Sequence, residues 1–143
     1  MKSFLSPLLR SGQTRAESFA LTNTRNNKIV AQTLLTAFDS ASRRKGLLDH
    51  AGLADGSAMI IAPTSAIHTF KMRFAIDVLF LSKDGRVLKV RPHMKRGRIA
   101  AAWRAFAVVE LAAGAIERSD TRPGDSLQVS AAENNLAGTK QID

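Results

Sequence analysis

Residues 68–81 read His-Thr-Phe-Lys-Met-Arg-Phe-Ala-Ile-Asp-Val-Leu-Phe-Leu, and this stretch decides the fold. Its even positions are apolar apart from His68, while its odd positions are polar or small as far as Asp77. Alternation with period two predicts a β-strand that is covered on one face. From Ile76 onward both faces become apolar, Asp77 excepted, so the strand should enter the centre of the molecule. Because the run is long for one strand, we expect a bend or bulge at residues 73–75.

On either side of this stretch the chain predicts more short strands and two short helices. Turns are indicated at residues 26–27, 83–86 and 122–125, which are rich in Asn, Asp, Gly and Pro. The expected strands are 18–24, 28–38, 58–62, 68–81, 87–90, 105–111 and 126–129. The expected helices run from Asp39 or Ser40 to residue 48 and over 113–119, and residues 91–104 should form a basic loop. About seven short strands with two short helices indicate a compact, β-rich α+β fold. A barrel-like arrangement of the strands is one form that such a fold can take.

The length of 143 residues suits a single domain, which should span 18–131 between a polar lead-in at 1–17 and a flexible tail at 132–143. The chain has no cysteine, which excludes disulfides, thiol catalysis and thiolate metal sites. The apolar run at 4–9 is shorter than the roughly 7–15 residues of a secretory signal, and no stretch approaches the roughly 20 apolar residues of a membrane span. We therefore expect a soluble, cytoplasmic protein, with a periplasmic location left open.

Several motifs follow one another in a fixed order along the chain. They are Arg43-x-x-Gly46-Leu47-Leu48, Ile67-His68-Thr69-Phe70-x-Met72-Arg73-Phe74-x-Ile76-Asp77-Val78-x-Phe80-Leu81, Asp84-Gly85-x-Val87, Val109-Glu110-Leu111-x-Ala113-Gly114 and Pro123-Gly124-Asp125. This order resembles the domain of unknown function 192 family, the uncharacterised ACR proteins, over about residues 28–130. Ala75 and Ala112 stand where such proteins often have proline. The resemblance implies a compact β-rich α+β fold and supplies no activity.

Two carboxylates, Asp77 and Glu110, lie within apolar segments of the chain. An isolated buried charge is costly, so each should be paired or have a raised pKa. We predict that both are largely buried and that each contacts a cationic group or a backbone donor. Such carboxylates are typical of functional sites. Equally, Asp77 could accept backbone N–H groups at a bend, and Glu110 could hold a helix N-terminus or bind Arg43.

The candidate site consists of Arg43, His68, Thr69, Met72, Asp77 and Glu110. Arg43 should point inward to one of the carboxylates, whereas Arg44 and Lys45 should point to solvent, because neighbours on a helix diverge by about 100°. His68 has the chemistry of a general base or a ligand-orienting donor, and equally that of a structural histidine that fixes a loop. The groove of this site would be lined by Phe70, Met72, Phe74 and Trp103.

Other kinds of site find little support in the sequence. The three histidines lie far apart and lack the spacing of metal ligands, so we predict no metal site. The chain has neither a nucleophile elbow nor a glycine-rich phosphate loop, and we predict no cofactor.

The formal net charge is +9, from 21 Lys and Arg against 12 Asp and Glu. Between Asp84 and Glu110 there is no acid, and the cations are Arg86, Lys89, Arg91, Lys95, Arg96, Arg98 and Arg104, with Trp103 among them. From Arg91, Lys95, Arg96, Arg98 and Arg104 we expect weak, salt-sensitive binding to nucleic acid or another polyanion, without sequence preference. The plainer alternative is a solvated loop that keeps the protein soluble.

Three functions remain open. We favour a binding or accessory module that takes a small ligand or a protein partner in an apolar groove with polar residues at its centre. A small enzyme would use His68 with Asp77 or Glu110 as acid and base, and a polyanion binder would use the basic stretch. Convergence of His68, Asp77 and Glu110 on one concave pocket would favour the enzyme.

Overall fold

The structure is a computed structural model that describes residues 3–10, 19–45, 52–70 and 72–131 of the chain. Within these ranges it is β-rich and α+β, as expected, with more strands and one more helix than the sequence predicts. The strands are β1 (Phe19–Asn23), β2 (Ile29–Ala31), β3 (Thr33–Ala37), β4 (Ser57–Ile61), β5 (Ala66–His68), β6 (Ile76–Leu81), β7 (Val87–Met94), β8 (Ile99–Ala101), β9 (Ala107–Ala112) and β10 (Leu127–Ala131). The helices are α1 (Ser6–Arg10), α2 (Ser40–Lys45) and α3 (Ala115–Ser119).

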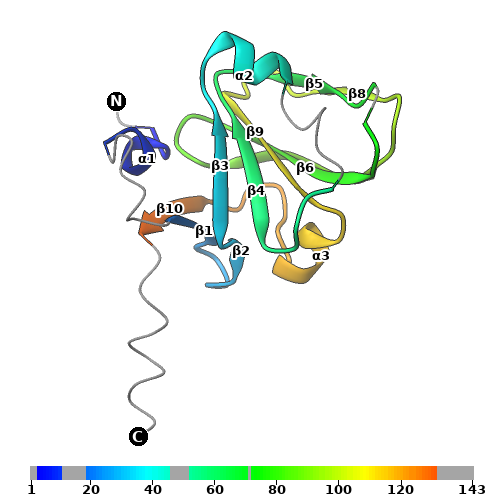
Figure 1. Cartoon of the computed structure of the whole chain (residues 1–143). Coiled ribbons are helices and arrows are strands. Elements are labelled where there is room, and N and C mark those ends of the chain that lie inside the picture. The colour runs from blue at the N-terminus through cyan, green and yellow to red at the C-terminus, as the bar shows by residue number, and fades with distance from the viewer. Residues whose placement is uncertain (1–2, 11–18, 46–51, 71, 132–143) are drawn as a thin grey trace, which may run out of the picture.

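The strands form three sheets (Figure 1). The central sheet has the order β3-β4-β9-β6-β7, in which β3 runs parallel to β4 and the other neighbours are antiparallel. A second sheet has the order β10-β1-β2, and β5 pairs with β8 in a third. These sheets stay separate rather than closing into one barrel. In Figure 1, α2 lies at the top of the molecule beside β5, and α3 lies at the opposite end.

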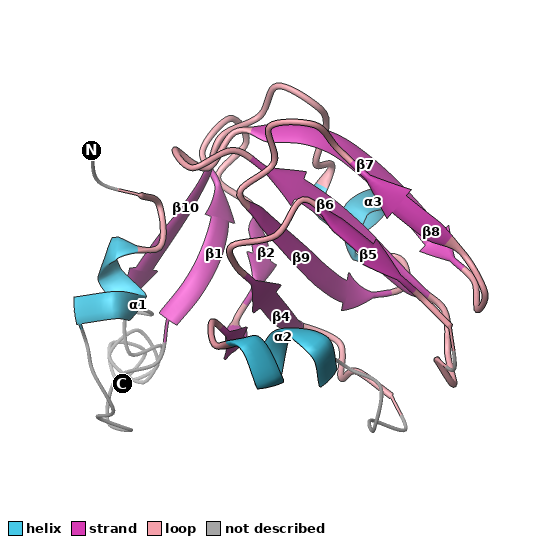
Figure 2. Cartoon of the chain, turned by 90° about the horizontal axis from the view of Figure 1, so that it is seen from above, coloured by secondary structure: helices cyan, strands magenta, loops and turns pink. Residues whose placement is uncertain are grey.

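The central sheet separates two apolar clusters. All residues of β6 and β9 are buried, because these inner strands are covered on both faces. The first cluster holds Leu79 and Val109 and is covered by the second sheet, α1 and α3. The second cluster holds Val78 and Phe80 and is covered by β5 and β8, which contribute Ile67 and Ala100. Figure 2 shows α1 with the second sheet on one side of the molecule and β5 with β8 on the other.

The register of the central strands decides which face each carboxylate occupies. Val78 of β6 and Met59 of β4 lie opposite Glu110 of β9, whereas Asp77 lies opposite Leu111. Directly paired residues share a face of the sheet, and successive residues alternate between faces. Glu110 therefore faces the second cluster, and Asp77 faces the first.

Two of the expected strands are each divided between two sheets. Residues 28–38 form β2 and β3, and the chain changes sheet at Gln32, where the N–H groups of Gln32 and Thr33 donate to the Gly56 carbonyl at 2.6 and 3.1 Å. Within the expected strand 68–81, β5 ends at His68 and β6 begins only at Ile76. The expected bend is therefore a complete break between two strands. An apolar run does not reveal such a break, because both sheets bury the same residue types.

Residues 91–104 form more than the expected basic loop, because they include the end of β7 and all of β8. β7 is an edge strand, and edge strands carry Lys and Arg more readily than inner strands do. These cations hide the alternation by which a strand is recognised. The strands expected at 18–24, 58–62, 105–111 and 126–129 and the helix at 113–119 are confirmed as β1, β4, β9, β10 and α3.

The N-terminal segment is packed onto the fold. Residues 1–17 are expected to be a polar lead-in, yet α1 forms here, and Phe4 and Leu5 are buried in the first cluster. The Phe4 N–H donates to the Lys83 carbonyl at 2.9 Å, which ties the segment to the turn between β6 and β7. The tail expected at 132–143 lies outside the described residues. No helix in the described part of the chain is both long enough and apolar enough to cross a membrane.

Candidate functional site

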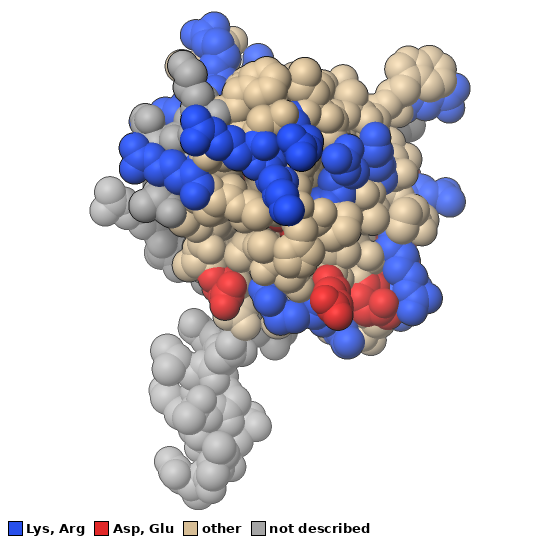
Figure 3. Space-filling model, turned by 90° about the vertical axis from the view of Figure 1, so that its right-hand side faces the viewer, with Lys and Arg blue, Asp and Glu red and all other residues tan. Residues whose placement is uncertain are grey.

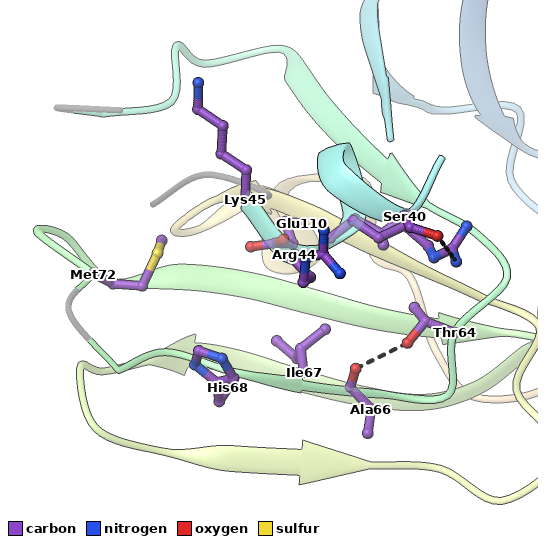
Figure 4. Close-up of a pocket in the computed structure, with 11 residues that line it drawn as sticks. Ser40, Arg44, Lys45, Thr64, Ala66, Ile67, His68, Met72 and Glu110 are labelled. Atoms are coloured by element: carbon purple, nitrogen blue, oxygen red, sulfur yellow. Dashed lines mark hydrogen bonds between the residues drawn. The ribbon is translucent and has the colours of Figure 1, made fainter. Parts of the chain in front are cut away.

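A cleft of about 620 Å³ lies between α2 and β5 (Figure 4). Its volume falls in the range of pockets that hold small molecules. The lining residues are Ser40, Arg43, Arg44, Lys45, Ile61, Thr64, Ala66, Ile67, His68, Met72 and Glu110. The structure therefore brings together four of the predicted site residues, Arg43, His68, Met72 and Glu110, and places Thr69 and Asp77 elsewhere.

The α2 side of the cleft is cationic. Asp39 caps this helix, since its Oδ1 accepts the Ser42 N–H at 2.7 Å, and this confirms the predicted helix start. The last turn carries Arg43, Arg44 and Lys45, and cations are favoured there because the C-terminal end of a helix is electronegative. Arg44 and Lys45 are exposed and Arg43 is half-buried, as the sequence predicts. The predicted end of the helix at residue 48 lies outside the described residues.

Arg43 has a different partner from the predicted one. Its Nη1 donates to the Phe38 carbonyl at 2.8 Å, and its Nη2 donates to the Ser40 hydroxyl at 3.4 Å. Among the described residues, no ion pair joins Arg43 to Asp77 or Glu110, so the prediction of such a contact is wrong. The carbonyl before the helix and the hydroxyl at its start lie within reach of the guanidinium. These local bonds hold the side chain at the cleft.

Glu110 lies on β9 and lines the same cleft as the cationic side chains of α2. Its side chain is 5% exposed, which confirms the predicted burial. Among the described residues no ion pair joins a cation to the carboxylate of Glu110, and burial alone shifts its pKa, so the predicted partner is not found there. Desolvation disfavours the charged form and raises the pKa of Glu110 to about 7. Near neutral pH, therefore, many molecules carry Glu110 as a neutral acid that can donate a hydrogen bond.

The β5 side of the cleft is formed by Thr64, Ala66, Ile67 and His68, with Met72 at one end (Figure 4). The Nδ1 atom of His68 accepts the Phe70 N–H at 3.3 Å, so a neutral His68 carries its proton on Nε2. The imidazole also stacks on Phe70, with ring centroids 4.9 Å apart. These two contacts fix the ring at the edge of the cleft.

Asp77 and Thr69 are fully buried and have structural roles. Asp77 accepts the N–H groups of Gly114 at 3.0 Å and Ile116 at 2.9 Å at the start of α3, and that of His93 at 2.8 Å. The prediction that Asp77 is buried against backbone donors is therefore confirmed. The hydroxyl of Thr69 accepts the N–H of Arg98 at 2.8 Å, and Arg98 lies in the turn that joins β7 to β8.

The lining of the cleft differs from the predicted groove. Of the four groove residues, only Met72 lines it, whereas Phe70 and Trp103 are exposed on the surface. Five further residues of the lining are not predicted from the sequence, namely Ser40, Ile61, Thr64, Ala66 and Ile67. Arg44 and Lys45, predicted to point to solvent, also line the cleft. The cationic run at the end of α2 is a readable signal. Ser40 and Thr64 carry no such signal, because only the arrangement of the sheets brings them to the cleft.

In the described ranges, no group of three or more His, Asp or Glu side chains is arranged as metal ligands would be. Among the described residues that line the cleft, His68 and Glu110 are the side chains suited to hydrogen bonding and proton transfer with a ligand.

Comparison with known proteins agrees with this fold. A family model described as Uncharacterized ACR, DUF192, matches residues 21–129. No curated protein matches the chain. A protein of unknown function from Novosphingobium aromaticivorans is 23% identical with a TM-score of 0.67, over 78% of this chain and 83% of that one. A Sinorhizobium meliloti protein, provisionally described as a transcription regulator, is 22% identical with a TM-score of 0.69, over 81% of this chain and 93% of that one. At these identities the likeness shows the fold alone.

Proposed function

Because this chain belongs to the DUF192 family of uncharacterized ACR proteins, which brings no activity with it, we propose a function from the cleft itself. The protein is a binding module that holds a small organic anion with an apolar body between α2 and β5. The observation that carries this proposal is that a buried, partly neutral Glu110 lines the same cleft as the cations Arg43, Arg44 and Lys45.

The chemistry of the lining supports such a ligand. Arg43, Arg44 and Lys45 attract a carboxylate or phosphate, and the protonated form of Glu110 donates a hydrogen bond to it. The apolar part of the ligand would contact the side chains of Ile61, Ile67 and Met72. Pockets of this kind combine apolar walls with a few convergent polar groups.

Acid–base catalysis is the second candidate. The observation that favours it is that His68 and Glu110 line the same cleft, and a pKa near 7 suits a general acid or base at neutral pH. We prefer binding for two reasons. Asp77, the third predicted member, faces the other side of the central sheet. In addition, Nδ1 of His68 is engaged by Phe70, and no side chain among the described residues orients Glu110.

The test is an NMR titration of the full chain, labelled with ¹⁵N, with hexanoate, hexyl phosphate and hexylammonium. We expect the two anions to bind with Kd on the order of 1 mM, with amide shifts centred on α2 and β5, and hexylammonium to give none. Arg44→Glu should abolish binding, whereas Lys28→Glu, the same charge change at an exposed site outside the cleft, should not.

Shifts spread over the whole surface, or equal binding of hexylammonium, would rule out the cleft as an anion site. Turnover does not enter this measurement, so the binding function and the catalytic candidate are tested separately.

A further inference from the structure

The turn between β7 and β8 presents its cations from a fixed backbone. We call residues 95–98 the basic turn; they are Lys95, Arg96, Gly97 and Arg98. Thr69, which is fully buried, clamps this turn. Its hydroxyl donates to the Lys95 carbonyl at 2.5 Å and accepts the Arg98 N–H at 2.8 Å, and its N–H donates to the Arg98 carbonyl at 2.8 Å. The Gly97 N–H donates to the Thr69 carbonyl at 3.1 Å.

Exposed rings lie close to the basic turn. The register of β5 and β8 pairs His68 with Ile99 and Ile67 with Ala100. Because Ile67 and Ala100 pack on the second cluster, His68 and Ile99 point outward. Phe70 stacks on His68 and is 44% exposed, so one aromatic surface lies at this end of the β5–β8 pair.

A second ring lies at the other end of the pair. Trp103 follows β8 and is 83% exposed, and the Arg104 guanidinium lies 4.6 Å from its ring centroid. Trp103 lies beyond the end of β8 at Ala101, while Phe70 lies beyond the end of β5 at His68, so the two rings would contact different bases.

The surroundings of these rings are strongly positive. No acid occurs between Asp84 and Glu110, while seven cations do. Figure 3 shows Lys and Arg side chains gathered across the upper half of this side of the molecule, with the Asp and Glu side chains in view along the lower edge. Exposed rings among cations match the recognition of single-stranded nucleic acid, in which bases stack on aromatic side chains and phosphates pair with Lys and Arg.

We propose that the basic turn and the β5–β8 pair bind single-stranded DNA or RNA, with phosphates at Lys95, Arg96 and Arg98 and bases stacked on Phe70 and Trp103. Single strands are favoured over a duplex because exposed rings stack only on bases that are free of a duplex stack. An anionic membrane surface fits less well. Insertion of Trp103 would carry the Arg104 guanidinium that lies on it toward the apolar layer, which is costly.

Trp103 is the only tryptophan of the chain, so its fluorescence reports on the proposed contact directly. We expect mixed-sequence single-stranded oligonucleotides of about 12 nucleotides to quench this fluorescence at about 20 mM salt. The affinity should fall at least tenfold at about 200 mM salt, because binding releases counterions. A duplex of the same sequence should quench Trp103 little.

Variants locate the contact. Changing Lys95, Arg96 and Arg98 together to Ser should weaken binding at least tenfold at low salt. Changing Lys28, Lys83 and Arg118 to Ser removes the same charge at sites outside the stretch from Asp84 to Glu110 and should weaken binding less than about threefold. The affinity of the Trp103 variants is measured with a dye-labelled oligonucleotide. Trp103→Ala should weaken binding about tenfold without changing the salt dependence, whereas Trp103→Phe should keep most of the wild-type affinity.

Absence of binding at low salt, or equal losses in the two triple variants, would overturn the proposal. So would binding that leaves Trp103 fluorescence unchanged, or equal affinity for duplex. Tighter binding to vesicles of anionic lipid than to oligonucleotides, with a blue shift of Trp103 emission, would assign the surface to membranes instead.

Discussion

At the scale of single residues, Asp77 and Glu110 show how the surroundings of two buried carboxylates give them different roles. Asp77 is satisfied by three backbone N–H groups and holds the start of α3. Glu110, one step away in the register of β6 and β9, has no such donors among the described residues, and desolvation raises its pKa to about 7. Asp77 therefore stabilises the fold, while Glu110 remains available to a ligand.

Replacing Glu110 by Gln should remove a loss of stability that depends on pH. Because the folded pKa of Glu110 is raised from 4.5 to about 7, the wild type has its full stability below pH 4.5. It loses stability as the pH rises, and the loss is complete above about pH 7. The shift corresponds to about 3 kcal/mol. In urea unfolding at about pH 4 and about pH 8, the stability of the wild type relative to Glu110→Gln should fall by up to this amount. A constant difference would contradict the assigned pKa.

At the scale of elements, the sequence predicts strands well where a run is bounded by turns, as for β4, β9 and β10. It fails where a strand passes from one sheet to another, as at Gln32, because hydrophobic periodicity carries no information about the partner strand. The same limit applies to the site. Glu110 and Asp77 are both recognisable as carboxylates in apolar runs, but only the register shows that they face opposite sides. Arg43 and His68 are recognisable by chemistry, whereas Ser40 and Thr64 are not.

Alanine variants of two turn glycines, Gly85 and Gly97, test how tightly the neighbouring elements pack. Gly85 and Gly97 both have positive φ, at 93° and 81°, but a Cβ on Gly85 would lie 2.5 Å from the Leu127 carbonyl oxygen and 3.0 Å from Phe4 Cβ. A Cβ on Gly97 would meet nothing within 4 Å. Both alanine variants should therefore carry the backbone strain of about 1–2 kcal/mol. Gly85→Ala should cost about 1–3 kcal/mol more in the free energy of unfolding. Equal costs for the two would contradict this packing of the β6–β7 turn.

At the scale of the whole molecule, Phe4 and Leu5 near the N-terminus belong to the core. Phe4 is 8% exposed and packs in the first cluster, whereas Leu9 of α1 is 61% exposed. Phe4→Ala should lower the free energy of unfolding by about 3–5 kcal/mol, and Leu9→Ala should lower it by less than about 1 kcal/mol. Thermal or urea unfolding measures both. A negligible effect of Phe4→Ala would contradict this packing of Phe4 in the first cluster.

The two proposed surfaces meet at β5. His68 lines the cleft on one side and stacks on Phe70 at the outer surface, so the α2 cleft and the β5–β8 pair share one short strand. The net charge of +9 favours anions at both places. Among the described residues, what distinguishes the cleft is Glu110, a buried carboxylate in its lining.

The most direct test is therefore the affinity for hexanoate between about pH 5.5 and about pH 8.5, measured by calorimetry for the wild type and for Glu110→Gln. Hexanoate is mostly ionised at about pH 5.5 and fully ionised at about pH 8.5, and its titration is the same in the experiments with the two proteins. Arg43, Arg44, Lys45 and His68 are common to both proteins, so the difference between the two curves reports on Glu110. As the pH rises through about 7, ionised Glu110 repels the ligand, and the wild type should lose at least tenfold more affinity than Glu110→Gln. Parallel curves for the two proteins, or no binding at any pH, would contradict an anion site built over Glu110.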